Sequence, residues 1–186
     1  MVSNEHINVI KRNGRGPETL DIDKIHSMVG FATEGITGVS ASHVEMNSGL
    51  QFFDGISTED IQQILIKSAN DLISLESPNY QYVAARLLLF SLRKSLHHRL
   101  WEHPKFITHI KKLVDLGLYD KGILDNYTEA EIDRMGMWID HERDYSFTYA
   151  GLRQVMDKYL VQDRSTGEIF ETPQFMYMMI SATLFA

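Results

Sequence analysis

Hydrophobic residues recur along most of the chain with the period of an α-helix. The clearest helix begins at Thr58, where small and apolar residues three or four positions apart form one stripe: Ile61, Ile64, Leu65, Ser68, Ala69 and Leu72. Residues 23–34 predict an earlier helix, which ends at Gly35. Another helix is expected to begin at Ser40 or Ser42 and to carry Val44, Leu50 and Phe53.

A further helix is predicted directly after Pro78, because the fixed φ and missing N–H of proline are tolerated at a helix start. One of its faces carries Val83, Leu87, Phe90 and Lys94. Ahead of all these helices, residues 7–10 and 19–22 are expected to form two short strands, joined by a Gly/Pro turn at residues 13–17. The first helix would then open at Asp23. This half of the chain therefore predicts four helices under a small β-hairpin lid.

The predicted lid carries a cluster of basic side chains. Lys11 and Arg12 follow the first strand, and Lys24 lies in the first turn of the following helix. The hairpin would bring the three cations to one edge, where a polyphosphate could bind. From these residues alone, a hairpin with solvated lysines is equally consistent.

The second half of the chain predicts helices and one hairpin. Thr128 and Glu131 fit a capping box, and residues 146–159 predict a helix. Residues 161–170 predict a β-hairpin with its turn at residues 165–167. After Thr172, residues 174–186 predict a helix that is apolar on every side, which is typical of a buried helix. The chain ends there without a helix stop signal, so we expect a piece of a longer or split subunit.

Composition narrows the class of protein. The chain has 186 residues, enough for one medium or two small domains, with 44% hydrophobic and 23% charged residues, as in soluble globular proteins. Its net charge of −7 argues against nucleic acid as the main partner. The longest apolar run, residues 175–186, is shorter than the roughly 20 residues that span a membrane. Since no signal peptide is visible either, we expect a cytoplasmic protein without a membrane partner.

Charge is unevenly distributed along the second half. A basic stretch contains Arg93, Lys94, Arg99, Lys105, Lys111 and Lys112, and residues 115–144 then carry nine acidic and three basic residues. We interpret this switch as the solvated faces of helices that pack together, with a patch for a partner subunit as the alternative. The histidines show no pair at i, i+4 spacing, so no metal site is expected.

Several segments resemble one family in the family's order. Residues 9–26 (VIKRNGRGPETLDIDKIH), 54–61 (DGISTEDI), 78–87 (PNYQYVAARL) and 92–94 (LRK) resemble the ATP-cone, the regulatory nucleotide-binding domain at the front of ribonucleotide reductase large subunits. Residues 140–144 (DHERD), 158–161 (KYLV) and 166–171 (TGEIFE) resemble the helical region that precedes the catalytic barrel of class I large subunits. The resemblance covers nearly the whole chain.

The resemblance implies a mainly α (α+β) fold in two parts. Residues 1–98 would form the ATP-cone, a hairpin lid over a four-helix bundle, and residues 99–186 a helical region with one hairpin, leading to a catalytic barrel that is absent. It implies that ATP or dATP, with Mg²⁺, binds as the overall-activity effector. The implied partners are the barrel-containing part of the large subunit and the radical-generating small subunit, in an oligomer. The chain has no cysteine, whereas this reductase mechanism needs a thiyl radical and a redox-active cysteine pair, so no catalytic residue lies here.

The resemblance also assigns nucleotide-binding residues. The phosphate ligands would be Lys11, Arg12, Lys24 and Lys94. Glu18 and Asp21 would accept hydrogen bonds from the adenine amino group and the sugar, with strand-edge polarity as the alternative. Thr58 would face the nucleotide at a helix start, or serve as a simple N-cap. Ile25, Ile61 and Phe90 would line the base pocket, with core packing as the alternative.

Two positions depart from the family pattern. The family's well-studied members have histidines where this chain has Gln62 and Ser91, and those histidines help to sense inhibitory dATP. The lid turn is also one residue longer. We therefore expect nucleotide binding with weak or absent inhibition by dATP. A stand-alone ATP/dATP-sensing module that acts on a partner protein is the alternative function, while a cone-containing repressor is excluded because its zinc ribbon needs cysteines.

Overall fold

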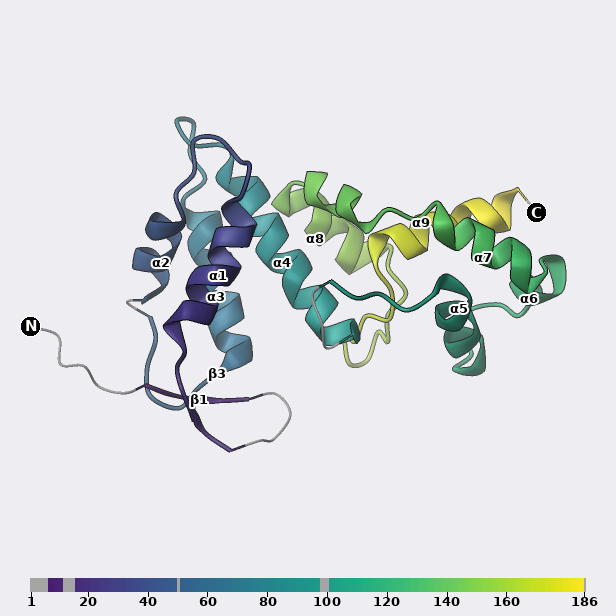
Figure 1. Ribbon diagram of the computed structural model, residues 1–186, viewed down its shortest axis with the longest axis horizontal. Coiled ribbons are helices and arrows are strands. Elements are labelled where there is room, and N and C mark those ends of the chain that lie inside the picture. Colours follow the sequence, from purple (N-terminus) through teal and green to yellow (C-terminus); the bar gives the residue numbers. More distant parts are fainter. Residues whose placement is uncertain (1–6, 12–15, 50, 98–100, 186) are drawn as a thin grey trace, which may run out of the picture. The chain divides into compact units, whose positions relative to one another are not determined.

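The computed structural model describes residues 7–11, 16–49, 51–97 and 101–185. Its elements in chain order are β1 (Asn8–Ile10), β2 (Glu18–Thr19), α1 (Ile22–Thr33), α2 (Ala41–Gly49), β3 (Ile56–Ser57), α3 (Thr58–Asp71), α4 (Tyr80–His97), α5 (Phe106–Asp115), α6 (Gly122–Asn126), α7 (Glu129–Met137), the 3₁₀-helix η1 (His141–Ser146), α8 (Tyr149–Lys158) and α9 (Pro173–Leu184) (Figure 1). The expectation of a mainly helical chain with a small sheet is confirmed.

The chain divides into two compact units. Unit 1 comprises Met1–Leu88 with Thr148–Ala150, and unit 2 comprises Leu89–Phe147 with Gly151–Ala186. Helix α4 therefore contributes its first half to unit 1 and its second half to unit 2. The predicted boundary at residue 98 stays a prediction, as does the bundle of four helices.

The sheet of unit 1 has three strands in the order β2-β1-β3. β1 and β2 pair antiparallel, as the predicted hairpin requires, with Val9 opposite Glu18. β3 pairs with β1 in parallel, with Ile10 opposite Ser57, and the sequence did not predict this strand. Two residues are too few to show the alternation that marks a strand. The buried side chains of Val9 and Ile56 hold the sheet against the helices.

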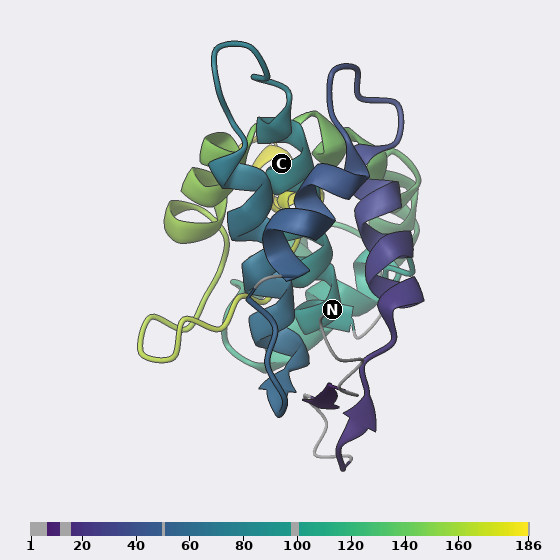
Figure 2. The ribbon, with the colours of Figure 1, turned by 90° about the vertical axis from the view of Figure 1, so that its left-hand side faces the viewer.

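The helices of unit 1 pack side by side above this sheet (Figures 1 and 2), and α2 contacts both α1 and α3. The predicted stripe of α3 faces the core, since Leu65, Ser68 and Ala69 are fully buried. Helix α2 begins at Ala41, directly after Ser40. Phe53 was wrongly expected in that helix: it lies beyond the end of α2 and is 60% exposed. Leu50 lies outside the described residues.

The first turns of α1 and α3 correct two predictions. The second strand ends at Thr19 rather than at Ile22, because Asp21 caps α1 and accepts a hydrogen bond from the Lys24 backbone N–H. Helix α3 begins at Thr58 as expected, but its N-cap is Ser57, whose hydroxyl accepts from the Asp60 N–H at 2.9 Å. The simple N-cap alternative for Thr58 is therefore wrong.

The core of unit 2 forms where α5, α7 and α9 meet. Its buried cluster consists of Phe106, Ile107, Ile110, Ile123, Ile132, Phe175 and Ala182. Helix α7 starts with the predicted capping box of Thr128 and Glu131. Gly136 on α7 allows the close approach of α5, because a Cβ there would lie 3.1 Å from the Phe106 Cβ.

Two predicted elements of unit 2 have different bounds. The helix expected over residues 146–159 is divided by Phe147, whose backbone is extended, so η1 ends at Ser146 and α8 begins at Tyr149. Residues 161–170 do fold back on themselves, since the Phe170 N–H donates to the Val161 carbonyl at 2.9 Å. However, they form only an isolated bridge between Gln162 and Ile169 rather than two full strands.

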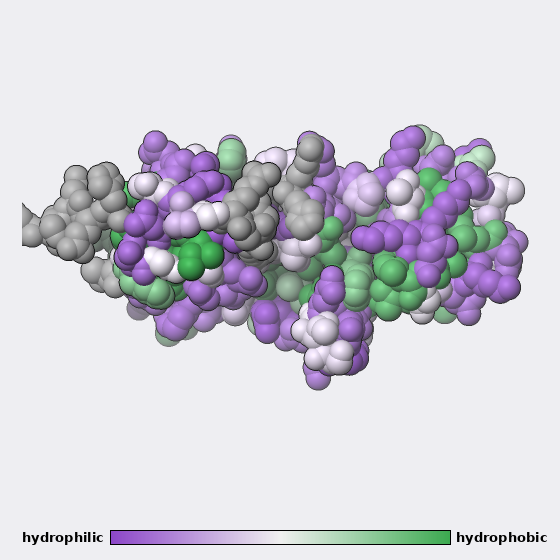
Figure 3. Space-filling view, turned by 90° about the horizontal axis from the view of Figure 1, so that it is seen from below, coloured by the Kyte–Doolittle hydropathy of each residue, from purple (hydrophilic) through white to green (hydrophobic). Residues whose placement is uncertain are grey.

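Helix α9 starts with the predicted Thr172 cap, but it is not buried on every side. Phe175 and Ala182 belong to the core of unit 2, whereas Ile180 and Leu184 are 47% and 70% exposed. The helix therefore packs within the chain along one face, and the expectation of a helix buried on every side was wrong. Hydrophobic side chains are visible on one face of unit 2 (Figure 3). No helix within the described ranges is long and apolar enough to cross a membrane.

Candidate functional site

The lid brings three of the predicted binding residues together. Lys11 follows β1 directly and forms an ion pair with Glu18 of β2. Strands β1 and β3 run in parallel, and their last residues, Ile10 and Ser57, lie opposite each other. The residues that directly follow the two strands are Lys11 and Thr58. The register thus brings the backbone of Lys11 beside the start of α3, where backbone N–H groups point out of the helix. Arg12, the other predicted phosphate ligand of the lid, lies outside the described residues.

A second pair lies at the start of α1. The Lys24 ammonium is 3.0 Å from one carboxylate oxygen of Asp21, and the other oxygen caps the helix. The hydrogen bond from Lys24 lowers the pKa of Asp21, and the same contact raises the pKa of Lys24. The Lys24 side chain is 75% exposed, so a phosphate can reach it. Lys11 and Lys24, the predicted cations of unit 1 that lie in the described residues, are thus each paired with a predicted acceptor, Glu18 or Asp21.

Asp54 is a structural residue of the lid to which the sequence assigned no role. Its carboxylate accepts two hydrogen bonds from Asn8, from the backbone N–H at 2.7 Å and from the side-chain amide at 3.0 Å. These bonds lower the pKa of Asp54. Gly55, with a φ of 83°, then lets its N–H donate to the Asn8 carbonyl at 2.8 Å. The Asp-Gly turn therefore fixes β3 beside β1; the motif was visible in sequence, but its strand partner was not.

The apolar candidates of unit 1 are largely buried. Ile25 and Ile61 are 7% and 5% exposed, so core packing accounts for most of their surface. Thr58 is half-buried as the first residue of α3. Glu59 and Asp60 follow it, so a phosphate at this helix start would also meet two carboxylates. This arrangement makes the neighbouring cations necessary for any anion to bind here.

Phe90 and Lys94 lie in the part of α4 that belongs to unit 2. Phe90 is 1% exposed and packs edge-on against Tyr145 and Trp101, with ring centroids 6.3 Å and 5.7 Å away. Its ring is therefore occupied by core contacts, and Lys94 is half-buried.

The two departures from the family pattern lie in the interior. Gln62 is 3% exposed, and its side-chain amide donates to the Leu87 carbonyl at 2.9 Å. The amide thus ties α3 to α4 within unit 1. Ser91 is 8% exposed. The Gln62 amide is already engaged by the protein, so it is not a ready donor to a phosphate.

Unit 2 contains a buried polar network that the sequence did not predict. Arg93 is 2% exposed, and its guanidinium donates to the His141 carbonyl at 2.6 Å and to the Tyr145 hydroxyl at 3.0 Å. It also lies 3.6 Å from the buried Asp144 carboxylate. Burial raises the pKa of Asp144 to about 6, although the hydrogen bond from Gln174 acts to lower this pKa. For Arg93 and Asp144 the prediction of solvated charges was wrong.

Histidines distant in sequence gather in the same unit. The His103 and His141 rings stack with centroids 3.6 Å apart, and His97 lies edge-on to His103 at 5.2 Å. His109 lies against Phe175 at 4.4 Å. Burial lowers the pKa of His103 and His109 to about 3 and that of His141 to about 4. Over the described ranges, no group of three histidine or acidic side chains could hold a metal ion.

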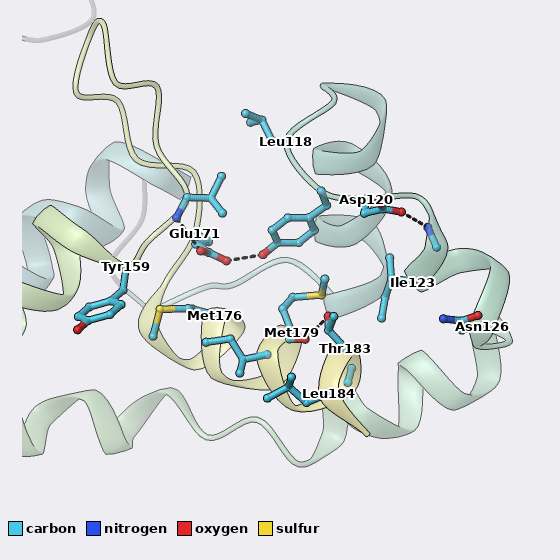
Figure 4. A pocket seen from close by; sticks show the side chains of 15 residues that line it. Leu118, Asp120, Ile123, Asn126, Tyr159, Glu171, Met176, Met179, Thr183 and Leu184 are labelled. Atoms are coloured by element: carbon cyan, nitrogen blue, oxygen red, sulfur yellow. Dashed lines mark hydrogen bonds between the residues drawn. The ribbon is translucent and has the colours of Figure 1, made fainter. Parts of the chain in front are cut away.

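A cavity of about 530 Å³ opens beside α9 (Figure 4). Glu171, 1% exposed, lies in its wall, where it accepts hydrogen bonds from the Tyr119 hydroxyl and, at 2.7 Å, from the Val161 N–H. Burial raises the pKa of both Glu171 and Tyr119. The rest of the lining is mostly apolar, with Ile123, Met176, Met179, Ile180 and Leu184 among its residues.

Comparisons with known proteins identify the family. Residues 7–95 match the ATP cone domain, and residues 145–186 match the ribonucleotide reductase all-alpha domain. These matches confirm the expected resemblance to the N-terminal region of ribonucleotide reductase large subunits. It is 47% identical over 183 residues to the ribonucleoside-diphosphate reductase 1 subunit alpha of Escherichia coli, which covers 98% of this chain and 24% of the relative. The corresponding subunits of Haemophilus influenzae and Enterobacteria phage T4 are 48% and 45% identical.

The chain spans about a quarter of the length of these relatives. The ATP-cone match contains all ten predicted nucleotide-binding residues, and the lid that the structure describes lies within it. The all-alpha match begins at Tyr145, inside η1, and continues through α8 and α9.

Proposed function

We propose that this chain binds ATP or dATP, with Mg²⁺, as the overall-activity effector of a ribonucleoside-diphosphate reductase. The observation that carries this proposal is the strand pairing that places Lys11 beside the start of α3 at Thr58. This arrangement lies within residues that match the ATP cone domain. A cation next to a helix N-terminus suits a phosphate group.

The charges of the lid support the assignment. A nucleoside triphosphate carries about four negative charges, so its phosphates require several cations and Mg²⁺. Lys11 and Lys24 are now paired with Glu18 and Asp21. Incoming phosphates would take over the two ammonium groups and release the carboxylates to accept hydrogen bonds from the adenine amino group and the sugar hydroxyl. Arg12 and Lys94 would complete the phosphate ligands, and Ile25, Ile61 and Phe90 would line the base pocket.

The enzyme would be completed by protein outside these 186 residues. The chain contains no cysteine, so the thiyl radical and the redox-active pair of this mechanism must come from elsewhere. We propose that residues 1–98 act as the cone and residues 99–186 as the region leading to a catalytic barrel, in an oligomer with the small subunit. The all-alpha match of residues 145–186 favours this role over a stand-alone sensor, which has no need of that region.

Calorimetric titration with ATP and Mg²⁺ tests the site. Lys24→Ala and Lys94→Ala should each weaken binding at least about tenfold, equal to about 1.4 kcal/mol, because each removes a phosphate ligand. Lys67→Ala is the matched control, because Lys67 forms an exposed ion pair with Asp71 on α3. This variant should bind ATP as tightly as the wild type does. Unchanged affinity in both site variants would refute the assignment.

The regulatory proposal concerns dATP. Because Gln62 donates to the Leu87 carbonyl and Ser91 carries no charge, the chain lacks the two histidines that would sense the inhibitor. Charge-assisted hydrogen bonds contribute about 1.5–3 kcal/mol each, so we expect weak or absent inhibition by dATP in the assembled holoenzyme. The double change of Gln62→His and Ser91→His should increase inhibition. Strong inhibition of the wild type at micromolar dATP would contradict this proposal.

A further inference from the structure

Helix α4 is the element through which a nucleotide in the cone could act on unit 2. It runs without interruption from Tyr80 to His97, and its residues from Leu89 onward belong to unit 2. Two proposed nucleotide ligands, Phe90 and Lys94, lie in this second half. Arg93 lies between them in sequence, directly before Lys94. Any displacement of the last turns of α4 therefore moves Arg93 as well.

Arg93 connects α4 to η1 at three points. Its guanidinium donates to the His141 carbonyl and the Tyr145 hydroxyl, and it lies 5.1 Å from the centre of the Tyr145 ring. It also pairs with the Asp144 carboxylate at 3.6 Å. Phe90 adds an edge-on contact with the same Tyr145 ring. The second half of α4 thus holds η1 through one charged and one aromatic side chain.

Asp144 continues the connection from η1 to α9. Its carboxylate accepts a hydrogen bond from the Gln174 amide at 2.8 Å, and Gln174 lies in the first turn of α9. Asp144 is 1% exposed, so water competes little with these contacts. A continuous set of polar contacts therefore runs from Arg93 through Asp144 to Gln174.

The central ion pair is sensitive to small movements. Its 3.6 Å separation is longer than a good charge-assisted hydrogen bond, which is about 2.7–2.9 Å. Among the described residues, neither the Arg93 Nε nor the Asp144 Oδ2 has a hydrogen-bond partner. In a buried site, the energy of such a pair changes steeply with distance. A shift of α4 by a fraction of an ångström can therefore strengthen or weaken the whole set.

We propose that the contacts Arg93–Asp144–Gln174 transmit nucleotide occupancy from α4 to α9, so that ATP at Lys94 alters the stability of η1 and the first turn of α9. This inference rests on the proposed nucleotide site. The coupling arises because phosphates that bind Lys94 reposition the turn that also carries Arg93. Both ends of the transmission lie within unit 2, since the second half of α4, η1 and α9 all belong to it.

Hydrogen exchange of the whole chain, with and without saturating ATP and Mg²⁺, tests the proposal. ATP should slow the exchange of backbone amides in residues 141–147 and 174–178 by about threefold or more in the wild type. In Gln174→Ala the response of residues 141–147 should remain while that of residues 174–178 is lost. This variant leaves the buried ion pair intact, so it disturbs the fold less than a change at Arg93 or Asp144 would.

Asp144→Asn provides a second variant, in which the α9 response should also be lost. The matched control is Asp157→Asn, the same change in an exposed pair with Arg153 on α8, which should keep both responses. Calorimetry on each variant should show ATP affinity within about twofold of the wild type, so that lost transmission is distinguished from lost binding.

The results separate this inference from the proposed function. If ATP binds the wild type but exchange in residues 174–178 does not change, the transmission is refuted while the nucleotide site stands. An α9 response that persists in Gln174→Ala and Asp144→Asn would also refute it. If ATP does not bind the wild type, the proposed function fails, and this inference fails with it.

Discussion

The ion pairs of the two units differ in their exposure to solvent. At the start of α1 in unit 1, Lys24 pairs with Asp21 while its side chain remains 75% exposed. In unit 2, Arg93 pairs with Asp144, and the two side chains are 2% and 0% exposed. Solvated pairs contribute little to stability and can exchange partners, whereas breaking a buried pair leaves a charge without solvent. The first arrangement suits a surface that binds an anionic ligand, and the second fixes how helices pack.

Two histidines show the same division. His26 of unit 1 is 69% exposed beside Glu45, whereas His109 of unit 2 is 4% exposed and lies against Phe175. The stability of unit 2 should therefore depend on the protonation of buried groups, and that of unit 1 should not. Both tryptophans, Trp101 and Trp138, belong to unit 2, so their fluorescence reports the unfolding of that unit.

The largest effect is expected when the buried pair is broken. Arg93→Met leaves Asp144 without its cation, and we expect the free energy of unfolding of unit 2 to fall by about 3–5 kcal/mol. Urea titration followed by tryptophan fluorescence measures this change. The double variant Arg93→Met with Asp144→Leu should recover most of the loss.

The matched change in unit 1 is Lys67→Met, which breaks the exposed pair with Asp71 on α3. We expect a loss of less than about 1 kcal/mol, measured by urea titration of the helical circular dichroism. Similar losses in Lys67→Met and Arg93→Met would remove the contrast between the units.

A smaller effect is expected from acidification. The pKa values of His103, His109 and His141 lie at about 3 to 4, below the ordinary value of 6.5, so the unfolded state binds more protons between those values. Their contribution to stability is therefore lost as the pH falls below 6.5. The raised pKa of Asp144, at about 6, opposes this change between pH 6 and 4, as does that of Glu171.

Because three imidazoles outnumber the two carboxyl groups, the free energy of unfolding of unit 2 should fall between pH 7 and pH 5. Urea titrations at several pH values measure the slope of the free energy of unfolding against pH. His103→Gln should reduce it, whereas His26→Gln, in the exposed pair of unit 1, should not. A slope that is flat in the wild type would contradict the assignment of neutral, buried imidazoles.

The smallest of the losses expected in unit 2 concerns the buried carboxylate at the cavity. Tyr119→Phe removes the hydroxyl that donates to Glu171, which then keeps the Val161 N–H as its other donor. We expect a loss of about 1–3 kcal/mol, the cost of leaving a buried acceptor unpaired. Tyr177→Phe on the exposed side of α9 is the control and should change stability by less than about 0.5 kcal/mol. Equal losses would mean that the hydroxyl of Tyr119 has no special role.

Sequence patterns predicted the elements that depend on local contacts. The stripe of α3, the capping box at Thr128 and the Thr172 cap of α9 are all visible within a few residues, because helix periodicity and capping act over short distances. The motifs also led to the right family. Strand β3 was missed because β1, its partner in the described part of the chain, lies more than 40 residues earlier.

The burial of charged and apolar side chains was decided by tertiary packing. The sequence pattern places Lys94, not Arg93, on the face with Val83, Leu87 and Phe90. Arg93 is nevertheless buried, because η1, about 50 residues later, supplies a carbonyl, a hydroxyl and a carboxylate. Likewise, an apolar α9 predicts burial on all sides, but a helix that packs along one face leaves Leu184 exposed. Local sequence therefore determined the helices, their caps and the family, whereas long-range contacts alone determined which charges the interior holds, because desolvation depends on every neighbouring segment at once.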